Sequence, residues 1–146
     1  MKLMFFDLRD DEPAILDRYL KTLPADCTIT ATEDPFTLDY INGVQGCDAI
    51  VTNNTSILGA PELEALHEAG VRAVSVRCIG YNQVDLATAK RLGIRVCNTV
   101  YPPYGVAEFT IMLMLMALRN AKPAIARQQV NNYVLKGLMG RELRDL

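Results

Sequence analysis

Short apolar runs alternate with helical segments along the first hundred residues, and this alternation limits the possible folds more than any other feature. The apolar runs predict buried strands at residues 3–7, 27–32, 49–51, 72–77 and 94–100. Helical segments are predicted between them, at residues 12–23, 36–41, 61–70 and 85–92. Strands that are joined through helices form a parallel sheet covered by those helices. We therefore expect an α/β fold with five parallel strands.

The pattern changes at Tyr101, because the sequence YPPYG continues neither a strand nor a helix. The following segment, 106–120, predicts a long helix that is apolar on nearly every side. Such a helix is expected to be buried on several sides, and the small domain before it has too little surface to bury it alone. A second helix is predicted over 121–134. We thus expect a flavodoxin-like, doubly wound domain at 1–100, followed by long helices within 101–146.

Composition and charge exclude several classes of function. Lys and Arg number 15 against 17 Asp and Glu, so the net charge of −2 predicts no binding of nucleic acid or of an anionic membrane. The longest apolar run, 111–118, is much shorter than the roughly 20 residues that cross a bilayer. No CxxC pair occurs among the cysteines, which predicts reduced, mostly buried thiols and no metal site. The start of the sequence lacks a signal-peptide pattern, so we expect a soluble cytoplasmic protein.

Catalytic groups are scarce in this sequence. The single histidine, His67, lies in a predicted helix between Glu64 and Glu68, which is typical of a solvated face, so no nucleophile and base pair can be assembled. The sequence contains neither GxGxxG nor GxxxxGK[ST]. No residue of this chain is therefore predicted to be catalytic.

Ligand-binding residues are expected in the loops that follow the strands, since ligands of doubly wound sheets bind at the carboxyl ends of strands. Gly80 follows the fourth predicted strand, and its missing side chain would let backbone amides approach an anion such as a carboxylate. A plain turn is the alternative for this tripeptide, Cys78-Ile79-Gly80. Tyr101 ends the fifth strand, where its phenol would either bind a polar ligand or complete the core.

Three consecutive motifs within residues 76–119 indicate a family. They are Arg-x-x-Gly-x-x-x-x-Asp from Arg77, Ala-x-x-x-Gly-Ile-x-Val-x-Asn from Ala89, and Tyr-x-Pro-x-x-Val-Ala-Glu from Tyr101. Together they closely resemble the D-2-hydroxyacid dehydrogenase family, above all its D-lactate dehydrogenase branch. The order of elements in residues 1–75 agrees with this resemblance.

The resemblance implies a role for each part of the chain. Residues 1–100 would be the substrate domain of an NAD-dependent dehydrogenase that acts on a small 2-hydroxy or 2-keto acid. Residues 101–146 would form interdomain helices, with 106–134 making the contact of a homodimer. In that family the nucleotide-binding domain and the catalytic Arg, Glu and His follow the position of Leu146. We therefore expect this chain alone to bind no NAD and to be inactive.

The resemblance also implies substrate-binding residues. The backbone of Ile79 and Gly80 would hold the substrate carboxylate, Tyr101 would contact the substrate, and the loop of Asn53 and Asn54 would border the cleft.

Two further positions are candidates. Cys78 lies in the carboxylate-binding loop, where the branch often has Asn, and Val106 in the third motif is the candidate for a cofactor contact. An alternative function from a different class is a non-enzymatic module that dimerises through its long helices and binds a small carboxylate or a partner chain.

Overall fold

The computed structural model describes residues 1–145, and the contacts within it separate a unit of Met1–Tyr101 from a second unit that begins at Pro102. The strands of the first unit are β1 (Lys2–Phe5), β2 (Thr28–Ala31), β3 (Ala49–Thr52), β4 (Ala73–Val76) and β5 (Arg95–Asn98). Its helices are α1 (Pro13–Leu20), the 3₁₀ helix η1 (Leu38–Val44), α2 (Ala60–Glu68) and α3 (Leu86–Leu92).

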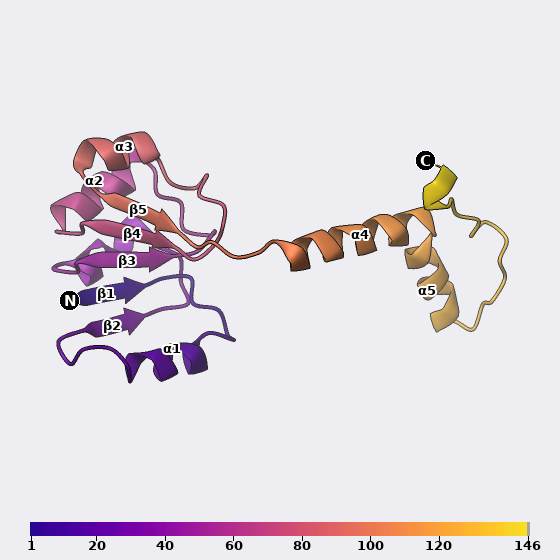
Figure 1. Cartoon of the computed structure of the whole chain (residues 1–146), viewed down its shortest axis with the longest axis horizontal. Coiled ribbons are helices and arrows are strands. Elements are labelled where there is room, and N and C mark those ends of the chain that lie inside the picture. Colours follow the sequence, from indigo (N-terminus) through magenta and orange to yellow (C-terminus); the bar gives the residue numbers. More distant parts are fainter. Residues whose placement is uncertain (146) are drawn as a thin grey trace. The chain divides into compact units, whose positions relative to one another are not determined.

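The five strands form one parallel sheet in the order β2-β1-β3-β4-β5 (Figure 1). This arrangement confirms the predicted α/β fold with a doubly wound, flavodoxin-like sheet. The chain adds β2 on one side of β1 and then adds β3 on the other side, so the direction in which strands are added reverses between β1 and β3. In open sheets of this kind, ligands bind beyond the carboxyl ends of the strands at such a reversal. A ligand site is therefore expected at the loops after β1, β3 and β4.

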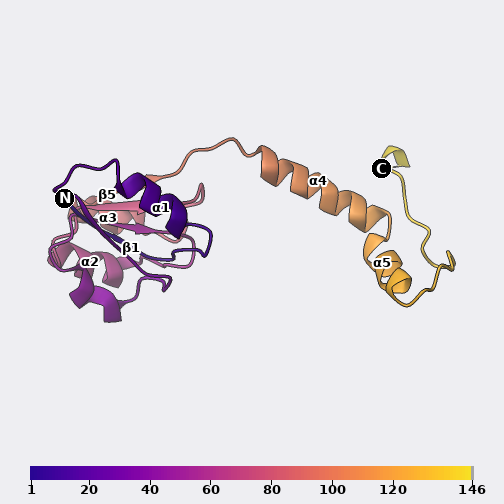
Figure 2. The same cartoon turned by 90° about the horizontal axis from the view of Figure 1, so that it is seen from below.

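The hydrophobic core lies between the sheet and one layer of helices. Helix α2 packs against both η1 and α3 on one face, whereas α1 lies on the other (Figures 1 and 2). Because strand side chains alternate between faces, Met4 of β1, Ile50 of β3 and Val74 of β4 all point into this core. The ring of Phe6 lies edge to face against Phe36, with centroids 5.2 Å apart.

The opposite face of the sheet is covered less completely. Helix α1 contributes no buried residue. It ends at Leu20, before the predicted residue 23, and helical backbone is disfavoured at Leu23 because this residue precedes Pro24. A hollow of about 450 Å³ lies between α1 and the sheet. Apolar side chains line most of it: Leu3, Phe5, Leu8, Ile15, Leu16, Tyr19, Leu23 and Ile29.

Two predictions for the first unit need correction. The segment predicted as a helix at 36–41 forms the 3₁₀ helix η1 instead, starting two residues later at Leu38. The cysteines are free but are not mostly buried, because only Cys47 is buried and Cys97 is exposed on the edge strand β5. Burial raises the pKa of the Cys47 thiol, which keeps that thiol protonated and unreactive.

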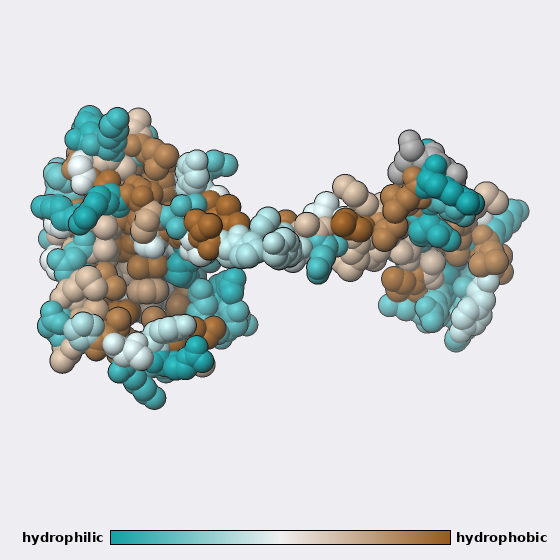
Figure 3. Space-filling model, in the orientation of Figure 1, coloured by the Kyte–Doolittle hydropathy of each residue, from teal (hydrophilic) through white to brown (hydrophobic). Residues whose placement is uncertain are grey.

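The second unit contains α4 (Tyr104–Leu118), α5 (Ala121–Gln129) and the 3₁₀ helix η2 (Leu143–Asp145). The expectation that α4 is buried on several sides is wrong within this chain, since α4 has no buried residue. Apolar side chains gather along it in the space-filling view (Figure 3). Among the residues that the structure describes, no single helix is long and apolar enough to cross a membrane, although α4 and α5 together, bent by 70°, meet the length and composition criteria.

Helix α5 ends earlier than the predicted residue 134. The chain turns at Asn131, which has a left-handed φ of 54° that helical backbone does not tolerate. The guanidinium group of Arg127 holds the returning chain by donating to the carbonyl oxygens of Val134, at 2.9 Å, and Lys136, at 2.7 Å. These hydrogen bonds replace the helical turn that the sequence predicted.

Candidate functional site at the carboxyl edge of the sheet

The loop after β3 is fastened to the end of β1 by a buried carboxylate. Asp7 is only 6% exposed and has a left-handed φ of 55°, which Asp tolerates better than most residues do. Its carboxylate accepts hydrogen bonds from the backbone N–H of Asn53 and the hydroxyl of Ser56, both at 2.7 Å, and from the hydroxyl of Thr55. Three donors therefore compensate the buried charge and fix the loop.

Arg77, directly after β4, also connects loops at this edge of the sheet. Its guanidinium donates to the carbonyl oxygens of Phe6, at 2.9 Å, and Asp7, at 2.8 Å, and it also pairs with the carboxylate of Glu12. Burial by itself would raise the pKa of Glu12, but hydrogen bonds from the Arg9 amide and from Arg77 outweigh it and lower that pKa. Glu12 is thus held as an anion, and the loops after β1 and β4 are joined.

The loop of Cys78, Ile79 and Gly80 presents unused donors to solvent. Its carbonyl groups are engaged: Thr99 N–H donates to Cys78 at 3.3 Å, the Asn98 side-chain amide donates to Ile79 at 2.8 Å, and the Cys78 thiol donates to Gly80 at 3.0 Å. In contrast, the backbone N–H groups of Ile79 and Gly80 donate to no atom among residues 1–145.

The space next to these donors is open. Ile79 and Gly80 are both exposed, and a Cβ added at Gly80 would meet no atom of residues 1–145 within 4 Å apart from its chain neighbours. Two adjacent N–H groups without acceptors, beside open space, are suited to bind an anion through charge-assisted hydrogen bonds.

Asn53 is held from both sides of its peptide backbone. Besides the bond from its N–H to Asp7, its carbonyl oxygen accepts a hydrogen bond from the Gln83 side-chain amide at 3.4 Å. The same Gln83 nitrogen lies 3.6 Å from the sulfur of Cys78. The structure therefore brings together two of the predicted loops, those of Asn53 and Cys78, with Gln83 between them.

The remaining predicted residues are less closely connected. Asn54 is exposed and donates its backbone N–H to the side-chain oxygen of Asn53. Tyr101 is exposed at the end of the first unit, so the alternative that its phenol completes the core is wrong. Val106 is exposed in α4 and belongs to the second unit.

Sequence reasoning missed Asp7, Glu12 and Gln83 as parts of this region. Asp7 carries the only visible signal, because a carboxylate ends an apolar strand pattern at the edge where ligands bind. Each has a partner far along the chain: Gln83 and Asn53 are 30 positions apart, Asp7 and Asn53 are 46 apart, and Arg77 and Glu12 are 65 apart. No local pattern reports contacts over such separations.

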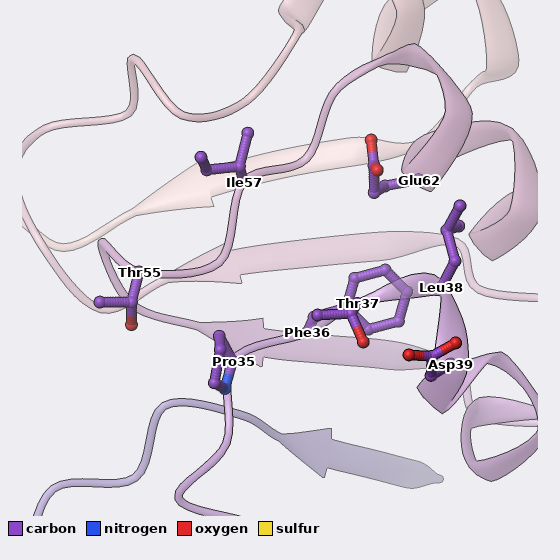
Figure 4. A pocket seen from close by; sticks show the side chains of 8 residues that line it. All are labelled: Pro35, Phe36, Thr37, Leu38, Asp39, Thr55, Ile57 and Glu62. Atoms are coloured by element: carbon purple, nitrogen blue, oxygen red, sulfur yellow. The ribbon is translucent and has the colours of Figure 1, made fainter.

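A cavity of about 440 Å³ opens beside the loop after β3 (Figure 4). It is lined by Pro35, Phe36, Thr37, Leu38, Asp39, Thr55, Ile57 and Glu62. Its acidic side chains, Asp39 and Glu62, make it unsuited to an anion, and its lining includes neither Ile79 nor Gly80. The candidate anion site is thus the exposed loop after β4 and not this cavity.

The fold and the loop geometry agree with a comparison of the chain to known families. The family model described as "D-isomer specific 2-hydroxyacid dehydrogenase, catalytic domain" matches residues 3–145. The chain therefore belongs to the D-isomer specific 2-hydroxyacid dehydrogenase family, and its residues are those of the catalytic domain. This result confirms the resemblance on which the site residues were predicted.

Individual relatives place the chain within that family. It is 35% identical over 145 residues to 2-hydroxyacid dehydrogenase A of Aspergillus oryzae, covering 98% of this chain and 42% of that protein. The solved structure of apo D-lactate dehydrogenase from Escherichia coli is 29% identical, with a TM-score of 0.76, over 97% of this chain and 45% of that one.

A third structure supports the fold alone. The D-lactate dehydrogenase of Aquifex aeolicus, solved with NAD and lactic acid, has a TM-score of 0.85 at 20% identity and covers 99% of this chain and 42% of that one. The 146 residues thus span less than half the length of each of these relatives.

Proposed function

We propose that this chain is the substrate-binding part of an NAD-dependent oxidoreductase that interconverts a small 2-hydroxy acid of D configuration and its 2-oxo acid. Membership of the family supports the reaction class. Relatives named as D-lactate dehydrogenases favour lactate and pyruvate as the pair of substrates. In this assignment the first unit is the substrate domain and the second unit provides interdomain helices.

The observation that carries the proposal is the pair of unused, exposed N–H groups of Ile79 and Gly80. Two backbone donors match the two oxygens of a carboxylate, and charge-assisted hydrogen bonds of this kind are about twice as strong as neutral ones. With the carboxylate held there, C2 of the substrate is fixed for reaction and its C2 oxygen is available to further donors. We assign Tyr101 to contact the substrate, and Asn53, Asn54 and Cys78 to border it.

NAD would supply the hydride acceptor or donor when it is bound. The residues of this chain contain no GxGxxG motif, and its one histidine lies in α2 and not at the carboxyl edge. They therefore do not fit a dinucleotide site by themselves. The role that we assign to this chain is to bind and orient the acid, with Val106 as its candidate contact to a cofactor held elsewhere.

An NMR titration of the isotope-labelled chain with oxamate, a close analogue of pyruvate, tests this role. We expect the amide signals of Ile79 and Gly80 to shift in a saturable manner, while acetate at the same ionic strength shifts them less. If oxamate leaves both signals unmoved, the carboxylate site is wrong. Mixing the chain with NADH and pyruvate and recording the absorbance of NADH tests the expectation that it is inactive alone.

A second candidate role is assembly, which the exposed apolar surface of α4 favours. We propose that residues 106–134 form the contact of a homodimer, whether the chain acts as part of an enzyme or as a non-enzymatic module. A cytoplasmic location is also proposed, and the four free cysteines support it because thiols stay reduced in that compartment.

A further inference from the structure

Both backbone polar groups of Asn53 are bound by side chains that come from different loops. The N–H donates to the buried carboxylate of Asp7 at 2.7 Å, and the carbonyl oxygen accepts from the side-chain amide of Gln83 at 3.4 Å. Asp7 follows β1 and Gln83 lies in the loop between β4 and α3. The peptide of Asn53 is therefore fixed at two points in addition to its own chain.

The side chain of Asn53 is fixed as well, but only through its oxygen. Oδ1 accepts the backbone N–H of Asn54 at 3.0 Å, whereas the Nδ2 group donates to no atom of the described residues. Although Asn53 is only 9% exposed, its Nδ2 is not among the side-chain atoms that are shut off from water, so this NH₂ group is open to solvent and to a ligand. The conformation thus leaves one hydrogen-bond donor for a ligand at the carboxyl edge of the sheet.

We propose that Asp7 and Gln83 are positioning residues that present the Asn53 side-chain amide to the C2 oxygen of a 2-oxo or 2-hydroxy acid. This inference rests on the proposed function, because it requires an acid bound at the loop of Ile79 and Gly80. Gln83 also lies 3.6 Å from the sulfur of Cys78, so the loop with the amide is next to the loop with the carboxylate donors. Neither Asp7 nor Gln83 touches the acid itself.

A double-mutant cycle on oxamate binding, followed by NMR, separates positioning from general stabilisation. Asn53→Ala and Asp7→Asn should each weaken oxamate binding about tenfold, the usual effect of losing one hydrogen bond to a charged or strongly polar group. The double variant should bind no more weakly than Asn53→Ala alone, because Asp7 acts through Asn53. Gln83→Ala should show the same lack of additivity with a smaller effect, about threefold.

Thr22→Val provides the control. It removes a hydroxyl that donates to the Tyr19 carbonyl oxygen at 2.7 Å, a hydrogen bond that involves neither Asp7 nor Asn53, so oxamate binding should stay within about twofold of the wild type. Melting curves establish that each variant is folded, and the cycle with Gln83→Ala decides the question if Asp7→Asn does not fold.

Each outcome has one meaning. Additive losses, or unchanged binding by both Asp7→Asn and Gln83→Ala, overturn the positioning role while leaving the carboxylate site intact. If the wild-type chain itself does not bind oxamate, the proposed function and this inference are both contradicted. This outcome is distinct from the others because it is seen without any substitution.

Discussion

The guanidinium of Arg77 forms a bidentate ion pair with the carboxylate of Glu12, at 2.9 and 3.1 Å, although the two residues are 65 positions apart. Their side chains are 17% and 20% exposed, so the pair is largely removed from water. The same guanidinium donates to two carbonyl oxygens at the end of β1. One side chain thus connects the carboxyl ends of β1 and β4 with the start of α1.

Loss of this connection should lower the stability of the first unit. We expect Arg77→Gln to reduce the free energy of unfolding by about 2 kcal/mol, between the values for exposed and fully buried ion pairs. Urea unfolding of the 146-residue chain measures the change. The exposed pair of Arg9 and Asp11 offers a control, and Arg9→Gln should unfold like the wild type. Equal effects of the two substitutions would contradict the importance of the buried pair.

The hydrogen bonds that Glu12 accepts from the Arg9 amide and from Arg77 predict how stability depends on pH. The folded-state pKa of Glu12 is below its ordinary value of 4.5, so the carboxylate stabilises the folded protein fully above that pH and loses the effect as pH falls through the folded-state pKa. The difference in unfolding free energy between the wild type and Glu12→Gln should therefore be largest near neutral pH and shrink below pH 4.5. In the Arg77→Gln background this pH dependence should be weaker but not lost, because the Arg9 N–H still donates to the Glu12 carboxylate at 2.8 Å. An unchanged pH dependence would contradict a contribution from Arg77.

The strands were predictable because each contains a short apolar run. The ends of some helices were predictable from a single residue: Gly93, for example, ends α3 with a left-handed φ of 70°. The location of Ile79 and Gly80 at the carboxyl edge followed from the strand order in the same way. What the sequence did not reveal was tertiary: the unused N–H groups, and the hydrogen bonds of Asp7 and Gln83 to Asn53, depend on loops that meet only after folding.

Gly140 occupies a position with no room for a side chain. A Cβ there would lie 2.3 Å from the carbonyl oxygen of Leu118 and 2.8 Å from Cα of Arg119, and both are backbone atoms at the end of α4. We expect Gly140→Ala to displace this segment and to speed the hydrogen exchange of the Arg141 amide, which bonds to the Leu118 carbonyl at 2.8 Å. Gly105→Ala should leave that exchange rate unchanged, because within the described part of the chain a Cβ there would meet no atom within 4 Å beyond its chain neighbours and its own helix backbone.

The exposed surface of α4 requires an explanation in terms of assembly. Side chains such as Phe109, Leu113 and Met114 are each about half exposed, and the apolar residues of α4 are not confined to one side of the helix. Continuous exposed apolar surface of this kind usually marks an interface. We therefore expect the chain to associate through α4, as the proposed homodimer requires.

A charge placed on this helix should prevent that association without unfolding the first unit. Met114→Asp would bury an unpaired carboxylate in the interface, which costs roughly several kcal/mol. Light scattering on a sizing column should therefore report a monomer where the wild type gives a dimer. Ile57→Asp, at a similarly exposed apolar residue of the first unit, should leave the dimer intact. Thermal melting of the sheet should be the same in all three proteins, because α4 lies in the second unit. A monomeric wild type, or a dimer that persists in Met114→Asp, would show that α4 is not the interface.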